Sequence, residues 1–149
     1  MRFDAEDYRW AALERIQAAK IQFDVGAYPE CIYLAGLATE CILRAYRLRS
    51  DPSFDSRHDL PDLLRVSGLE NFVPDTRRPQ LAAALADVWI RWKNDYRFAS
   101  QDRLGREFRA KKLLTGHKGD ALKANAGIAL SSGQQLVGIG DARWRSLIT

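Results

Sequence analysis

Apolar residues recur every three or four positions along four long segments of the chain, with polar and charged residues between them. The segments cover residues 4–25, 28–49, about 78–97 and about 120–139. This spacing places the apolar side chains on one face of an α-helix. No segment alternates apolar and polar residues as a half-buried strand does. The pattern predicts an all-α fold: an up-and-down four-helix bundle with one or two short extra helices.

The first two helices are predicted to be antiparallel neighbours, because the sequence between them, VGAYPE, has the chemistry of a tight turn. Gly26 can adopt the positive φ that ends many helices. Pro29 suits the first turn of a helix, where its missing N–H costs nothing. A chain of 149 residues is the size of one ordinary domain. We therefore expect a single domain over residues 1–149, with its core at about 5–139.

The second helix carries an apolar stripe of mostly small side chains, which would let neighbouring helix backbones approach closely. They are Cys31, Ala35, Gly36, Ala38, Cys41 and Ala45. Ten residues of helix span about 15 Å, too far for a disulfide, so both cysteines are expected to be reduced core residues. Glu40 lies beside the stripe, and a carboxylate there needs a partner or a route to water.

The stretch RHDLPDLL reads as the start of a short helix. Asp59 is a candidate N-cap, Pro61 fits the first turn, and Asp62 lies at the positive end of the helix dipole. Gly68 would end this helix. His58 is the one residue that this interpretation does not explain, and it has either a structural, capping role or a place in a functional pocket.

The helix at 78–97 is predicted to turn a row of large side chains inward. They are Leu81, Leu85, Val88, Trp89, Trp92 and Tyr96. Trp89 and Trp92 are three residues apart and are expected on one face as core aromatics, with a binding groove as the alternative. After DYRFAS comes a basic, weakly periodic stretch to Leu114, which Thr115 and Gly116 close.

Positive charge is concentrated in one part of the chain. Residues 91–118 contain nine Lys or Arg against three Asp or Glu, whereas the whole chain has a net charge of +4. Such a segment can neutralise phosphates, or it can be an ordinary solvated face. The candidates for phosphate or nucleic-acid contacts are Arg103, Arg106, Arg109, Lys111, Lys112, His117 and Lys118. Between residues 103 and 118, Phe108 is the one Phe, Tyr or Trp, which gives base stacking little support.

The composition excludes several other classes of protein. Hydrophobic residues make up 46% of the chain and charged residues 28%, as in folded globular domains rather than disordered ones. No run approaches the ~20 apolar residues of a membrane span, and the N-terminal MRFDAEDYRW is acidic where a signal peptide is basic and then apolar. We expect a cytoplasmic protein. Two histidines and two distant cysteines give no metal-ligand spacing, and no metal or cofactor is expected.

Three motifs together resemble the HEPN family (higher eukaryotes and prokaryotes nucleotide-binding). They are the small-residue helix with ATECILRAY, the helix start HDLPDLL, and the aromatic helix that closes in DYRF. The matching residues of the first two motifs are Glu40, Leu43, Arg44, His58, Asp59 and Leu60. Arg97 and Phe98 match the ending found in members encoded beside a minimal nucleotidyltransferase. The resemblance covers roughly residues 5–139.

The resemblance implies one of two activities. Many members are metal-independent ribonucleases that use an Arg, four to six residues and then a His, in which the histidine moves the proton and the arginine stabilises the phosphate charge. Neither His58 nor His117 has an arginine at that spacing; Arg109 precedes His117 by one residue too many. Other members lack the pair and bind partners. We therefore expect a protein that does not cleave RNA.

The main hypothesis is a non-catalytic HEPN-like module that dimerises and binds a partner protein or a nucleotide or RNA ligand. The partner would be a nucleotidyltransferase or another operon-encoded protein of a toxin–antitoxin or phage-defence system. The alternative is an RNA-binding or degenerate ribonuclease role of the basic segment 91–118, and an enzyme with an unrecognised active site is a third possibility. The resemblance implies a cleft between the two protomers of a homodimer. Its candidate residues are Glu40, His58, Asp95 and Arg97, with Glu40 as the buried carboxylate that orients Arg97.

Overall fold

The computed structural model describes residues 1–54, 60–117 and 119–147, and within these ranges it contains helices and no strand. The predicted all-α class is thus confirmed. The α-helices are α1 (Ala5–Asp24), α2 (Tyr28–Ser50), α3 (Leu60–Ser67), α4 (Arg78–Arg91), α5 (Gln101–Ala110) and α6 (Ala121–Leu147). Short 3-10 helices are η1 (Leu69–Phe72), η2 (Asp75–Arg77) and η3 (Asn94–Phe98).

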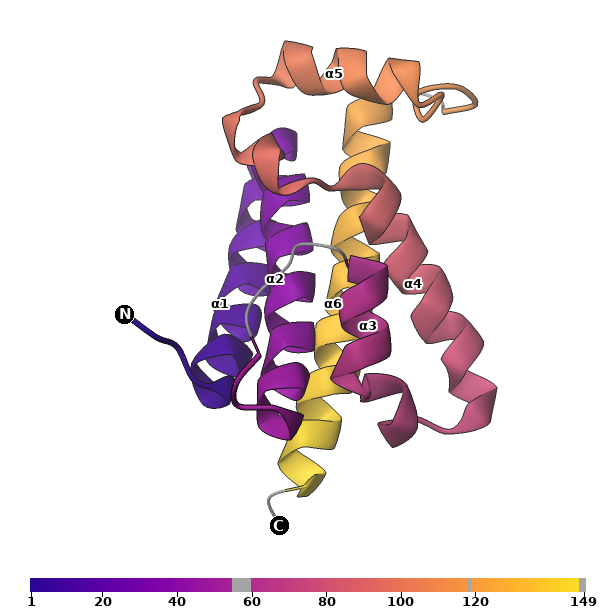
Figure 1. Cartoon of the computed structure of the whole chain (residues 1–149). Helices are drawn as coiled ribbons and strands as arrows, with labels where there is room; N and C mark the ends of the chain where they lie inside the picture. The colour runs from indigo at the N-terminus through magenta and orange to yellow at the C-terminus, as the bar shows by residue number, and fades with distance from the viewer. Residues whose placement is uncertain (55–59, 118, 148–149) are drawn as a thin grey trace.

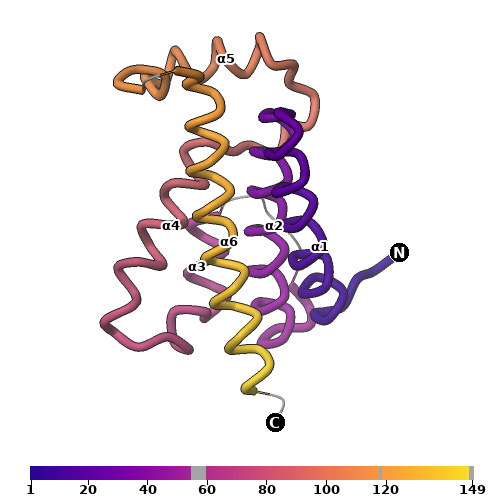
Figure 2. Tube along the Cα trace, turned by 180° about the vertical axis from the view of Figure 1, so that it is seen from behind, coloured from indigo at the N-terminus to yellow at the C-terminus, as the bar shows by residue number. Residues whose placement is uncertain are grey.

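The long helices lie side by side, and α2 and α6 form the centre of the arrangement (Figure 1). α1 covers both of them on one side, and α4 packs on α6 on the other. α1 and α4 run in one direction, whereas α2 and α6 run in the opposite direction. α5 lies across one end, far from the N-terminus and the C-terminal end of α6, as the reverse view also shows (Figure 2).

The glycine signals for helix ends have the predicted effect, whereas the N-cap candidate Asp59 lies outside the described residues. Gly26 has φ 80° in the turn between α1 and α2, and Gly68 has φ 73° directly after α3. Both values lie in the left-handed region that glycine adopts at little cost. Asp4 begins α1 with a capping box: its carboxylate accepts from the N–H of Asp7, and the Asp7 carboxylate accepts from the N–H of Asp4, both at 2.8 Å.

The small side chains of α2 and α6 allow very close packing. A Cβ on Gly36 would lie 2.0 Å from the Trp92 ring, and one on Gly140 would lie 2.4 Å from the Ile42 side chain. Gly36, Gly140 and Trp92 are all buried. The glycines of α6 lower its intrinsic helix stability, and this contact explains why one of them is present.

The two cysteines of α2 are free and buried, as predicted. Burial raises the pKa of both thiols to about 12.

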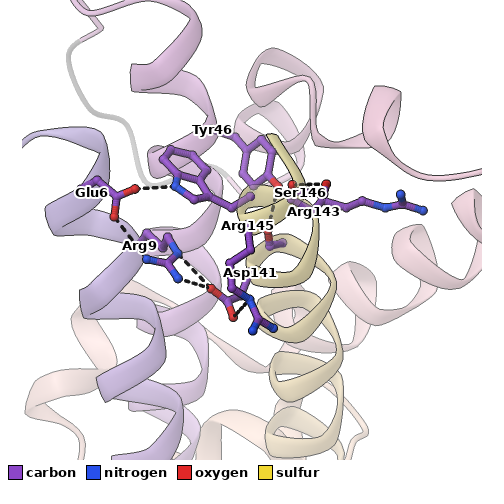
Figure 3. Close-up of polar contacts among 9 residues, drawn as sticks. Glu6, Arg9, Tyr46, Asp141, Arg143, Arg145 and Ser146 are labelled. Carbon is purple, nitrogen blue, oxygen red and sulfur yellow. Dashed lines mark hydrogen bonds and ion pairs between the residues drawn. The ribbon is translucent and has the colours of Figure 1, made fainter. Parts of the chain in front are cut away.

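α6 continues eight residues beyond the predicted end at Ile139, because polar contacts tie its last turns to α1 and α2 (Figure 3). Trp144 donates its indole N–H to Glu6 at 2.5 Å. Asp141 accepts from Arg9 at 2.8–2.9 Å and pairs with Arg145 at 3.3 Å. These contacts span most of the chain, so local sequence patterns do not reveal them.

Two predictions for the region after residue 78 are wrong. The helix expected at 78–97 ends at Arg91, because Trp92 has an extended backbone (φ −130°, ψ 139°). Trp89 and Trp92 therefore do not share a face: Trp92 is buried and Trp89 is 39% exposed. The basic, weakly periodic stretch contains the short helix α5. Ser100 caps this helix by accepting from the N–H of Arg103 at 3.2 Å.

A pair of glycine substitutions tests the close packing of α2. We expect Gly36→Ala to lower the free energy of unfolding by about 3 kcal/mol, because the rigid Trp92 ring must move. Gly138→Ala is the matched control, since a Cβ there meets nothing within 4 Å. It should instead raise stability by about 0.5–1 kcal/mol. Urea unfolding followed by circular dichroism measures both values, and equal effects of the two variants would contradict the packing.

Candidate binding surface at the η3–α5 end

The surface at one end of the bundle begins where Trp92 leaves α4. Its extended backbone turns the chain across the end of the helices into η3. The Trp92 ring is buried against Gly36, and this contact determines where the crossing starts. Tyr96, in the middle of η3, is also buried and packs edge to face on Phe108 of α5, with ring centroids 6.3 Å apart. Two buried aromatics therefore hold η3 against the bundle.

Lys111 connects the end of α5 to the same point. Its Nζ donates to the carbonyl of Ile90 at 3.0 Å and to the hydroxyl of Tyr96 at 3.2 Å. Burial, with the positive charge of Lys93 as a second cause, lowers the pKa of Lys111. Burial and the charge of Glu107 raise the pKa of Tyr96 to about 12. This lysine supports the structure instead of facing a ligand.

Phe98 is the most exposed aromatic side chain, at 77%, and it stands at the end of η3. The Arg97 guanidinium lies 4.5 Å from the centre of its ring. A pocket of about 400 Å³ on one side contains Asp95, Phe98 and Arg103. A second pocket of about 230 Å³ contains Arg97 and Tyr33, next to the start of α2. Ala99 lines both pockets, so Phe98 and Arg97 lie between the two pockets.

The basic residues of the segment 91–118 do not form one continuous positive face. Arg91 is buried, with Nε bonded to Asn125 at 2.9 Å and NH1 bonded to the carbonyl of Asp87 at 3.0 Å. Burial lowers its pKa. Lys93 and Arg103 approach the same carboxylate, Glu107, at 3.4 and 4.0 Å.

The remaining basic residues of α5 and its end point outward. Arg106, Arg109 and Lys112 are exposed and have no ion pair within the described part of the chain. His117 is half-buried in the loop before α6. Lys118 lies outside the described residues. Three of the predicted phosphate contacts are thus cations open to solvent along α5 and at its end, whereas Lys111 turns inward.

The residues predicted for a cleft between protomers lie in different parts of the chain. Asp95 and Arg97 are exposed at the η3 end, and His58 lies outside the described residues. Within the chain, Glu40 and Arg97 lie apart, and their pairing across a dimer stays a prediction. Glu40 is buried in α2 and accepts from Arg44, one turn away, at 3.2 Å. Arg97 lies beside Tyr33, two helical turns earlier, and donates to the carbonyl of Asn94 at 3.3 Å.

The described residues contain no group of three or more His, Cys, Asp or Glu that could hold a metal ion. No helix within the described ranges is both long and apolar enough to cross a membrane. Comparisons of the chain with protein-family models, with curated proteins and with solved structures found no match.

The sequence analysis did not predict that Phe98 is exposed, nor did it place the helix α5 that follows it. Both could have been found from the local pattern. Ser100 has the chemistry of an N-cap, Asp102 lies in the first turn, and Leu104 and Phe108 are four residues apart. A helix that starts at residue 101 needs a turn before it, and the turn places Phe98 at the surface.

Proposed function

We propose that the protein is a non-catalytic, HEPN-like helical module that forms a homodimer and binds a protein partner through the η3–α5 end. The observation that carries the proposal is Phe98, an aromatic side chain that is 77% exposed on a segment held by buried neighbours. Most of the ring faces water in the isolated chain, so covering it is favourable. Aromatic and arginine side chains are the groups that contribute most at protein interfaces.

The surroundings of Phe98 favour a protein partner over a nucleic acid. The pocket beside it contains both charge signs, with Asp95 and Glu107 opposite Lys93 and Arg103. Acidic groups there would repel a phosphate backbone, whereas mixed charges suit the polar rim of a protein interface. The partner would be a nucleotidyltransferase or another protein encoded in the same operon, of the toxin–antitoxin or phage-defence kind, as the family resemblance implies.

RNA binding is the second candidate function, and a different observation favours it. Arg106, Arg109 and Lys112 are exposed and free of ion pairs among the described residues. They could contact phosphates, and three such contacts would give a weak, salt-dependent and largely sequence-independent affinity. The expected absence of RNA cleavage stays a prediction from the missing Arg–His spacing.

The outer face of α4 supports the homodimer. Its side chains are small or apolar and carry no charge, and all are exposed: Pro79, Ala82, Ala83, Ala86, Trp89 and Ile90. They recur at three- and four-residue spacing, so they form one stripe along the helix. The other face of α4 is already packed on the bundle. A helix that is apolar on both faces favours a second contact, and the small residues leave room for the Trp89 ring of another copy.

The partner surface is tested by affinity capture from cells of the source organism. We expect one protein to co-purify with the wild-type chain in stoichiometric amount, and Phe98→Ala to reduce its recovery about tenfold. Phe98→Ala should not change thermal stability, since the side chain makes no buried contact. Ile21→Ala is the control, because it removes a side chain 60% exposed on α1.

Two outcomes would contradict the protein-partner proposal. One is equal capture by the wild-type chain and by Phe98→Ala. The other is recovery of RNA that is lost on a double substitution, Arg106→Ala with Arg109→Ala, and kept in Phe98→Ala. The second outcome would support the RNA-binding candidate instead.

The dimer is tested by light scattering at micromolar concentration. We expect a mass of two chains for the wild type and of one chain for Ala86→Glu, because a buried carboxylate in the middle of the α4 stripe has no partner. Ala142→Glu places the same side chain on the exposed part of α6 and should leave the dimer intact. A monomeric wild type, or a dimer that both variants preserve, would exclude the α4 interface.

A further inference from the structure

Another pocket, at the end of the bundle away from α5, has a buried arginine in its wall. It measures about 410 Å³ and lies between the residues before α1 and the C-terminal part of α2. The two ends are well separated in both views (Figures 1 and 2). This volume is typical of pockets for small molecules. The site is independent of the surface around Phe98.

Arg44 of α2 lines the pocket although its side chain is only 7% exposed. One of its N–H groups donates to Glu40 at 3.2 Å, and its guanidinium lies 5.6 Å from the ring centre of Tyr8. A guanidinium has five N–H donors. Within the described part of the chain, Arg44 contacts no other acceptor. None of its other nitrogens is both fully buried and without a partner. Arg44 therefore keeps N–H donors without a described protein acceptor, and it lines the pocket.

Among the described residues that line the pocket, the charges are positive on balance. Arg2 is a second cation in its wall, held by a hydrogen bond from its NH2 to the carbonyl of Pro52. No acidic side chain lines the pocket within the described ranges. Glu40 lies behind Arg44 and balances one charge. The nearby Asp51 is already bonded to Arg47 at 3.0 Å and to the hydroxyl of Ser53 at 2.6 Å.

Aromatic rings form the rest of the wall. Phe3, Tyr8 and Phe54 all line the pocket, and Phe3 and Tyr8 stack edge to face with centroids 6.0 Å apart. Phe3 is 47% exposed, so a ligand ring could cover part of it. The Tyr8 hydroxyl has no hydrogen bond to the described protein atoms and is a further donor. The pocket thus combines two guanidinium groups with an apolar wall.

We propose that this pocket binds a small phosphomonoester with an aromatic or apolar body. The phosphate would lie between Arg44 and Arg2, and the body would lie against Phe3, Tyr8 and Phe54. The planar guanidinium matches phosphate oxygens in geometry and charge, and arginine is the side chain that recognises phosphate with two parallel hydrogen bonds. Removal of water from a partly buried cation makes such a bond stronger than one at the open surface.

The test uses isothermal titration calorimetry on the full chain with three probes: phenyl phosphate, inorganic phosphate and phenol. We expect phenyl phosphate to bind saturably at one site per chain, about tenfold more tightly than inorganic phosphate, with no measurable binding of phenol. Arg44→Gln and Arg2→Ala should each weaken phenyl phosphate binding about fivefold or more. Arg65→Ala is the control, since it removes an exposed arginine that does not line the pocket.

Three other outcomes would each contradict the proposal. Absence of saturable binding would show that water satisfies Arg44. Equal affinity for phenyl phosphate and inorganic phosphate would show that free phosphate is the ligand and that the aromatic wall has no role. Loss of affinity in Arg65→Ala as large as in Arg2→Ala would indicate a general charge effect. Arg2 is exposed and can be replaced without a change in the core, so this variant decides the question even if Arg44→Gln does not fold.

Discussion

The contact of the Trp92 ring with the backbone of Gly36 is the constraint on which the η3–α5 end depends. No side chain larger than hydrogen fits at position 36 while the ring lies there. The contact coincides with the end of α4, because the residue that enters the core has an extended backbone and cannot continue the helix. The chain then crosses the bundle, Tyr96 enters the core beside Phe108, and Phe98 is left outside. The exposure of Phe98 is thus a consequence of the burial of Trp92 and Tyr96.

The two ends of the molecule differ in chemistry. The η3–α5 end has an exposed ring, mixed charges and exposed cations on α5, which are the properties of a macromolecular interface. The opposite end has a partly closed pocket with two arginines, which are properties of a small-ligand site. The small-residue face of α4 lies between them. Because α2 contributes residues to both ends, close packing along this helix positions both sites.

The sequence predicted the helices well where local chemistry determines them. Gly26, Pro29 and Gly68 mark breaks that the structure contains, and the reduced cysteines are a consequence of helix geometry. It failed where contacts between distant residues decide the outcome: Trp92 ends α4 because of Gly36, and Trp144 extends α6 because of Glu6. The carboxylate of Glu40 was expected to need a partner or a route to water, and Arg44, one helical turn away, is a partner that the sequence analysis did not name. Arg97 lies beside Tyr33, two helical turns before Glu40, so the two side chains of one chain are apart.

Hydrogen–deuterium exchange of the Trp92→Ala variant is the most direct test of the dependence of the η3–α5 end on Trp92. The contact with Gly36 is the first of a series of contacts, so its loss should also release η3 and α5 from the bundle. The account predicts that amides of η3 and α5 lose protection together, while those of α1 and the C-terminal half of α6 keep theirs through the Arg9–Asp141 and Glu6–Trp144 contacts. Unchanged protection of α5 in this variant, or a uniform loss along the whole chain, would contradict it.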